Sequence, residues 1–158
     1  QLAAAFGLPF AFASHFAPAA LMQALETYRS QFTPSTQLAE PYAIAGLNVF
    51  AAETAEEARF LRTSVQQSIL QLRRGAPCPL PPPVPDFEAG LSAAERQMLD
   101  QMQSCSVVGG PDTIGTGVAD FVEQTGVDEV MITAHIFDHD ARLRSLQITA
   151  EQLMLAPV

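Results

Sequence analysis

The sequence contains no lysine, and all eight of its basic residues are arginine. Schiff-base catalysis and pyridoxal-phosphate attachment need a lysine amine, and the phosphate loop of nucleotide-binding proteins needs a lysine as well. These chemistries are therefore excluded for this chain. The eight arginines stand against 17 acidic residues, which gives a net charge of −9. So acidic a chain opposes binding to a phosphate backbone, and we expect no nucleic-acid partner.

Cysteines and long apolar runs are also scarce. Cys78 and Cys105 are the only two cysteines. Because neither belongs to a CxxC pair, they form no disulfide framework of the secreted type, which favours a reducing, cytoplasmic setting. No apolar run approaches the roughly 20 residues of a membrane span, so no membrane partner is expected.

The first seven residues, QLAAAFG, lack the basic stretch of a signal peptide. They have instead the pattern of a helix end, with Gly7 just beyond the last turn. A helix that ends without a beginning indicates that the chain is the C-terminal part of a longer protein.

The 158 residues suit one domain, spanning 1–158. Apolar runs at 10–13, 42–52 and 129–134 have the character of strands, the shorter two buried on both faces, and helical patterns separate them. Capping boxes are predicted at Thr54–Glu57 and Ser92–Glu95, and Asp138 is a candidate cap for a final helix. That helix carries apolar residues at heptad-like spacing (Leu143, Leu146, Ala150 and Leu153). The alternation predicts an α/β fold with a parallel sheet of about three strands, too few for a closed barrel.

Residues 76–105 form a separate kind of segment. Six of the nine residues from Pro77 to Pro85 are proline, which excludes a helix interior and a central strand. A polyproline ligand of an SH3-like module is one interpretation. We favour a stiff surface connection, followed by a short helix that Ser92 begins.

Two polar clusters directly follow predicted strands. Ser14, His15 and Phe16 follow the first strand, whereas His135, Asp138 and His139 follow the last one. The carboxyl ends of parallel strands meet at one edge, where catalytic groups of barrels collect, so we expect both clusters at a shared rim. The alternative is that Asp138 only caps a helix and that the histidines are solvated. No metal site is predicted, because a helix that begins at Asp138 places His135 and His139 on no common face.

The glycine-rich stretch from Gly109 to Gly117 has two interpretations. Gly109 and Gly110 precede a predicted helix, and helix N-termini bind phosphate groups. However, the stretch lacks the lysine of a phosphate loop, and Asp112 in the first turn repels an anion. We favour an ordinary helix start with Pro111 at its first position and keep Gly109 and Gly110 as weak cofactor-binding candidates.

Five segments carry a family resemblance when they are read in order. They are residues 10–18 (FAFASHFAP), Tyr28-Arg29 with 32–35 (FTPS), Pro41-Tyr42 leading to Asn48-Val49, 108–111 (VGGP), and 128–130 (DEV) leading to 138–145 (DHDARLRS). Together they resemble the C-terminal half of bacterial-luciferase-like, flavin-dependent monooxygenases. The resemblance implies a partial (β/α)8 TIM barrel comprising about the sixth to eighth strands, with residues 76–105 as a Pro-rich insertion before the last strand.

The resemblance also implies a cofactor, partners and site residues. Reduced FMN would bind non-covalently, a separate flavin reductase would supply it, and O2 would then oxidise a small organic substrate. His15 and His135 become candidate catalytic residues, and the barrel-mouth candidates for the cofactor are Ser14, His15, Phe16, Asp138 and His139. Members of the family are longer than this chain, and most contacts to the FMN phosphate are expected before Gln1.

Half a barrel exposes open strand edges, so we expect either a missing N-terminal half or a homo-oligomer. Two other functions fit the same residues. One is hydride transfer by a flavin or deazaflavin enzyme of this fold, and the other is a non-catalytic module that binds flavin or a protein partner.

Overall fold

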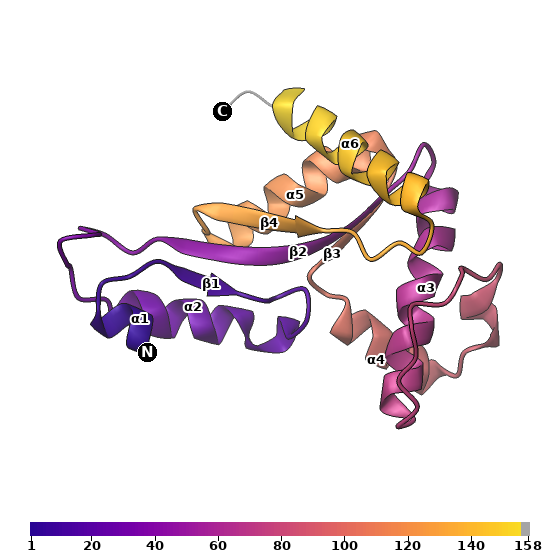
Figure 1. The fold of residues 1–158 in the computed structure, drawn as a ribbon, viewed down its shortest axis with the longest axis horizontal. Coiled ribbons are helices and arrows are strands. Elements are labelled where there is room, and N and C mark those ends of the chain that lie inside the picture. The colour runs from indigo at the N-terminus through magenta and orange to yellow at the C-terminus, as the bar shows by residue number, and fades with distance from the viewer. Residues whose placement is uncertain (156–158) are drawn as a thin grey trace.

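The computed structural model describes residues 1–155, and its centre is one long strand, β2 (Ala43–Ala51). Three shorter strands pair with β2, namely β1 (Phe10–Phe12), β3 (Ser106–Gly109) and β4 (Glu129–Thr133), and every pairing is parallel. β1 lies beside the start of β2, β4 lies beside its middle, and β3 lies beside its last four residues (Figure 1). The predicted parallel α/β architecture is confirmed.

β3 is a fourth strand that the sequence analysis did not count. It consists of only four residues and contacts β2 between Asn48 and Ala51. The run Val107–Val108 ends at once in two glycines and a proline, a pattern that is equally typical of a helix approach. This run is a strand because it pairs with the carboxyl end of β2. The residues of the run alone do not reveal that pairing.

Helices connect the strands. They are α1 (Leu2–Ala5), the 3-10 turn η1 (Pro18–Ala20), α2 (Leu21–Ser30), α3 (Ala55–Arg73), the 3-10 turn η2 (Phe87–Gly90), α4 (Ala93–Met102), α5 (Pro111–Thr125) and α6 (His139–Leu155). Ser92 and Glu95 form the complete capping box at α4, as predicted. At α3 only half of the predicted box forms, because Thr54 accepts from the Glu57 N–H without a reciprocal bond among the described residues.

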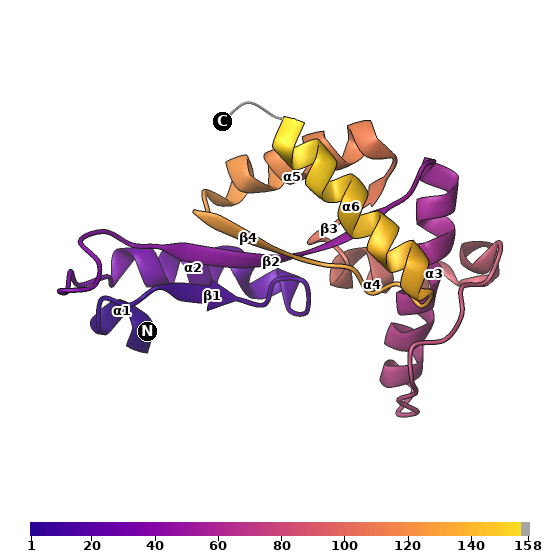
Figure 2. The same ribbon diagram turned by 45° about the horizontal axis from the view of Figure 1, so that its top comes forward.

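Helices α2, α5 and α6 contribute buried residues to a single core on β2; in Figure 2, α5 and α6 lie above β2 and α2 lies beside β1. The alternate residues Ala43, Ala45, Leu47, Val49 and Ala51 of β2 point into this main core and are at most 1% exposed. A second, smaller cluster joins α3 to the carboxyl end of β2 through Phe50, Ala52, Ala58, Leu61 and Ile136. The remaining face of β2, with Ile44, Gly46 and Asn48, therefore lies opposite the main helical layer.

Helix α6 turns a different face to the sheet than its leucine spacing suggests. Leu143, Leu146 and Leu153 are 51%, 38% and 39% exposed, whereas Ser145 and Ile148 are buried. Ser145 is buried because its Oγ accepts a hydrogen bond of 2.9 Å from the Ala51 N–H at the end of β2. An apolar stripe on α6 is thus left uncovered in this chain.

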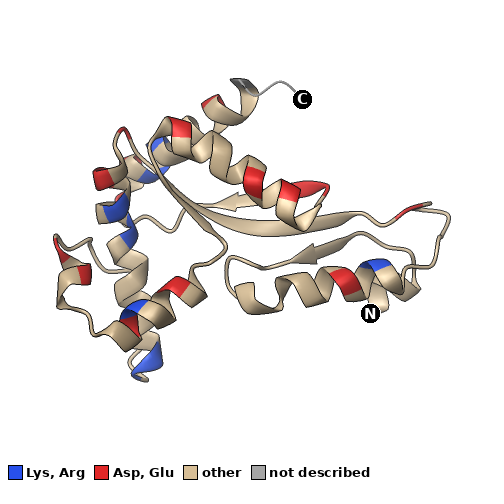
Figure 3. Ribbon diagram, turned by 180° about the vertical axis from the view of Figure 1, so that it is seen from behind, with Lys and Arg blue, Asp and Glu red and all other residues tan. Residues whose placement is uncertain are grey.

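The Pro-rich segment is held against α3. The Gln67 side chain donates to the Pro82 carbonyl oxygen, and the Val84 N–H donates to Thr63 Oγ1. Ion pairs Arg62–Glu88 and Arg74–Glu95 add further links, so charges of both signs gather around α3 and α4 (Figure 3). The Pro-rich segment therefore lies along α3.

Candidate functional site

Two histidines from opposite ends of the chain meet at the carboxyl ends of β1 and β4. His15 follows β1 by three residues, and His135 follows β4 by two. Their ring centroids lie 6.2 Å apart, with the ring planes inclined at 45°. The structure therefore brings together the two residues that the sequence analysis expected at a shared rim. We refer to His15, Gly46, Asn48, Thr133 and His135 below as the histidine rim.

Gly46 provides the surface on which the His15 ring rests. A Cβ atom at position 46 would lie 2.1 Å from His15 Nδ1 and 2.9 Å from its Cε1, far inside van der Waals contact. Any side chain at this position would therefore displace the imidazole. The same packing encloses Nδ1, which has no hydrogen-bond partner among the described residues. Nε2 is consequently the His15 nitrogen left to contact a ligand.

Two hydrogen bonds hold the segment that carries His15, and a third links Asn48 to β4. Ser14 is fully buried, and its Oγ donates to the Gly46 carbonyl oxygen over 2.6 Å. The Asn48 Nδ2 donates to the His15 carbonyl oxygen over 3.0 Å, and the Thr133 Oγ1 donates to Asn48 Oδ1 over 2.7 Å. Asn48 thus connects the end of β1 to the end of β4 across β2.

Neighbouring groups lower the pKa of His135, although its side chain is exposed. Partial desolvation of the imidazole lowers its pKa below the ordinary value of 6.5, and electrostatic repulsion from His15 lowers it further. The direction of this shift favours the neutral imidazole, in which one ring nitrogen donates and one accepts. A neutral, hydrogen-bonding imidazole suits a ligand with both donors and acceptors at its edge.

Three of the other predicted cofactor residues, Phe16, Asp138 and His139, are exposed and follow the rim histidines closely in the sequence. Phe16 is 74% exposed. Asp138 caps α6, since its Oδ1 accepts from the Ala141 N–H, as the sequence predicted. His139 is exposed, and its Nδ1 lies 2.7 Å from the Arg142 guanidinium. The hydroxyl of Ser14 donates to the Gly46 carbonyl oxygen, so Ser14 supports the rim, and its neighbour His15 is the candidate for contact with a ligand.

Gly109 and Gly110 lie at the junction of β3 and α5. Pro111 occupies the first turn of α5, as expected, and Asp112 adds a carboxylate there. A Cβ at Gly109 would clash with Thr113 at 2.7 Å, so this glycine is explained by the close approach of its own helix. The weak assignment of both glycines to phosphate binding gains no support from these contacts.

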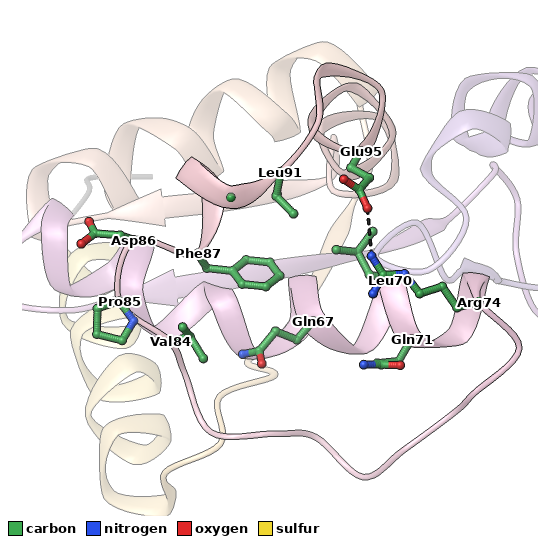
Figure 4. A pocket seen from close by; sticks show the side chains of 11 residues that line it. Gln67, Leu70, Gln71, Arg74, Val84, Pro85, Asp86, Phe87, Leu91 and Glu95 are labelled. Carbon is green, nitrogen blue, oxygen red and sulfur yellow. Dashed lines mark hydrogen bonds and ion pairs between the residues drawn. The ribbon is translucent and has the colours of Figure 1, made fainter.

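Two open cavities lie along α3. One, of about 460 Å³, is bounded by α3, the 84–91 segment and α4, with the Phe87 ring on one side and the Arg74–Glu95 pair on another (Figure 4). The second, of about 670 Å³, adjoins the start of α3 and shares residues Val84–Phe87 with the first. Neither cavity includes a residue of the histidine rim.

Sequence reasoning missed Gly46, Asn48 and Thr133. A glycine and an asparagine two residues apart inside an apolar strand are a usable signal, since both are depleted in strands and both point to the same face. Thr133 has no such signal, because threonine is common in strands. Among residues 1–155, no group of three or more His, Cys, Asp or Glu side chains is arranged to hold a metal ion, and no helix is long and apolar enough to span a membrane.

Known proteins resemble this chain along nearly all of its length. A luciferase-like monooxygenase of Escherichia coli strain K12 is 45% identical over 151 residues, which cover 96% of this chain and 45% of that protein. YvbT, an uncharacterized protein of Bacillus subtilis strain 168, is 46% identical with the same coverage. The chain therefore spans about half the length of the curated relatives it matches. No protein-family profile matches it.

Solved structures give the same result for the fold. MsnO8, in its apo form, superposes with a TM-score of 0.77 at 30% identity and covers 99% of this chain and 48% of its own. The monooxygenase RslO1 of Streptomyces bottropensis superposes with a TM-score of 0.58 at 18% identity, which concerns the fold alone. With its parallel sheet and covering helices, the chain forms a partial (β/α)8 barrel. In sequence and in fold, the chain therefore matches about half of a luciferase-like monooxygenase.

Proposed function

We propose that the complete protein carrying this chain is a flavin-dependent monooxygenase, and that the histidine rim faces the cofactor and a small organic substrate. The observation that carries the proposal is the His15–His135 pair at the carboxyl ends of parallel strands, in a chain 45% identical to a luciferase-like monooxygenase. Reduced FMN, when bound, supplies two electrons to O2. One oxygen atom then enters the substrate, and the other leaves as water.

The rim fits the ring system of a flavin. A flavin ring is flat and presents hydrogen-bond donors and acceptors along one edge. Here the small, exposed side chains of Ala11 and Ala13 lie at the end of β1, and His15 and His135 offer imidazole nitrogens for hydrogen bonds. The phosphate of FMN finds no comparable partner at Gly110, where Asp112 stands in the first helical turn. We therefore assign the phosphate contacts to residues outside this chain.

The rim residues have distinct tasks in this proposal. His15 and His135 contact the cofactor or the substrate and hold or accept a proton at a ring nitrogen. Ser14, Gly46, Asn48 and Thr133 fix the position of these rings. Because a water-excluding site protects reactive groups from side reactions, the open rim requires a cover in the complete protein.

Exposed strand edges and apolar side chains indicate where such a cover would pack. Among the described residues, β1 and β4 each pair on one side only, with β2. Met131 on β4 and the leucine stripe of α6 are exposed. We propose that the remaining strands of a barrel, or a second copy of the chain, cover these surfaces, and that a flavin reductase delivers the reduced cofactor.

Rapid mixing of reduced FMN with O2 tests the proposed function. The complete protein is expected to change the rate at which reduced FMN is reoxidised, and the H15A and H135A variants to lose most of that change. Y42F is the control, since Tyr42 contacts Glu129 at the opposite end of the sheet. A complex with FMN that leaves the reaction with O2 unaltered would instead favour hydride transfer, and no complex at tens of micromolar FMN would favour a non-catalytic module.

A further inference from the structure

Asn48 is the most unusual residue in the central strand. It is 4% exposed and lies in a strand whose neighbours are apolar. A buried amide without partners is costly, and asparagine is disfavoured in strands for its local hydrogen bonding. Such a residue is retained at little cost only where both ends of its amide are satisfied.

Both ends are satisfied here, and by two different segments. Nδ2 donates to the carbonyl oxygen of His15, and Oδ1 accepts from the hydroxyl of Thr133. Thr133 is the last residue of β4, two residues before His135. One side chain therefore joins the segment that bears the first rim histidine to the segment that bears the second.

The bond from Asn48 acts together with the bond from Ser14. Gly46 and Asn48 lie two residues apart on β2 and so face the same side of the sheet. Ser14 fastens to the carbonyl oxygen of Gly46, and the His15 carbonyl oxygen fastens to Asn48. Two attachment points on consecutive residues fix both the height and the rotation of the His15 backbone, whereas one point would leave the segment free to turn.

We propose that Asn48 is a positioning residue that sets His15 opposite His135 by bridging the His15 carbonyl oxygen and the Thr133 hydroxyl. Its importance for catalysis rests on the proposed function, whereas its effect on the two rings does not. Misplacement of a catalytic group by about 1 Å can cost on the order of 100-fold in rate. A variant that breaks the bridge is therefore expected to lower kcat strongly and the KM for reduced FMN only slightly.

The test uses the complete protein and three threonine variants. T133V keeps the shape of Thr133 but removes the donor to Asn48, whereas T133S keeps the donor. T125V is the control for loss of a buried hydroxyl, because within residues 1–155 Thr125 Oγ1 bonds only inside α5, to the Phe121 carbonyl oxygen. N48A removes both bonds at once.

Nuclear Overhauser contacts between the His15 and His135 rings report the positioning without cofactor. We expect this contact in the wild type, T133S and T125V, and its loss in T133V and N48A while thermal unfolding remains cooperative. If T133V and N48A keep the contact, the proposal is wrong, whatever the activity. If the contact is lost as expected but the wild type leaves the reaction of reduced FMN with O2 unaltered, the positioning stands and the proposed function fails.

T133V can also be compared with T133S by kinetics. We expect a kcat about 100-fold lower in T133V, with a change in KM for reduced FMN below about threefold. Equal kcat values for the two variants would contradict a positioning role. Should N48A fail to fold, the T133V and T133S pair decides the question alone.

Discussion

Substitution of Gly46 by alanine tests the geometry of the rim most directly. The added Cβ would lie 2.1 Å from His15 Nδ1, about 1.3 Å short of the 3.4 Å at which ordinary van der Waals contact begins. The backbone of β2 is held at this position, because Gly46 pairs with Met131 of β4 and the adjacent Ala45 pairs with Phe12 of β1. The imidazole must therefore rotate away from the sheet, and this rotation also moves it away from His135.

The expected loss of stability is small because a side chain can move where a backbone cannot. Overpacking costs about 1–3 kcal/mol. Replacing a strand glycine by alanine returns about 0.5–1 kcal/mol of backbone entropy. We expect G46A to lower the free energy of unfolding by about 1 kcal/mol in urea titrations and to abolish the ring contact between His15 and His135.

Gly115 provides the matched control. It lies inside α5, and a Cβ there would meet only Gln152, at an ordinary 3.8 Å. G115A should raise the free energy of unfolding by about 0.5–1 kcal/mol, because alanine favours helix. The reasoning is refuted if G46A is as stabilising as G115A and retains the contact between the two histidine rings.

Three further outcomes are expected. H15Q should raise the pKa of His135 toward 6.5, because it removes the electrostatic repulsion while the larger effect of desolvation stays. A 1H–13C NMR titration measures this pKa, and an unchanged or lower value would count against the pairing of the two histidines. The pKa of Glu88 is lowered, chiefly by the hydrogen bond from Gln66, so this carboxylate contributes stability above about pH 4.5 that is lost on acidification. E88Q should therefore make the free energy of unfolding less sensitive to pH on the acid side. An unaltered pH profile would show that the contact is unimportant. Sedimentation of the 158-residue chain alone should reveal association that L143Q weakens more than L72Q, since Leu72 on α3 is 54% exposed and Leu143 on α6 is 51% exposed. A monodisperse monomer at high concentration would contradict an uncovered interface.

Much of the rim could be predicted because it depends on the direction of the strands. Parallel strands bring their carboxyl ends to one edge, so the chain positions of His15 and His135 just after two strands were sufficient to place them together. The cap at Asp138 and the capping box at Ser92 depend only on neighbours in the sequence and were equally predictable. The roles of these residues in catalysis stay predictions.

The bonds that fix the rim could not be predicted, because they depend on register between segments far apart in the sequence. Asn48 meets Thr133 only because β2 and β4 pair with these two residues in register. A shift of one residue would turn Asn48 to the other face of the sheet. Similarly, β3 is recognisable as a strand only through its pairing with the end of β2.

The face that α6 turns to the sheet illustrates the limit of apolar periodicity in a different way. Its leucines repeat at heptad-like spacing, yet the side chains that pack on the sheet are those around Ser145 and Ile148. Ser145 is preferred there because β2 ends with the Ala51 N–H, a donor that no strand partner takes and that a leucine could not satisfy. A helix on the outside of a barrel packs against the sheet and also against a helix on each flank. Apolar spacing therefore shows which side chains are to be covered, but it does not show whether the sheet or a neighbouring helix covers them. The exposed leucines of α6 therefore follow the rule that a cluster of exposed apolar side chains marks an interaction surface, and we expect further barrel elements or a second copy of the chain to cover it.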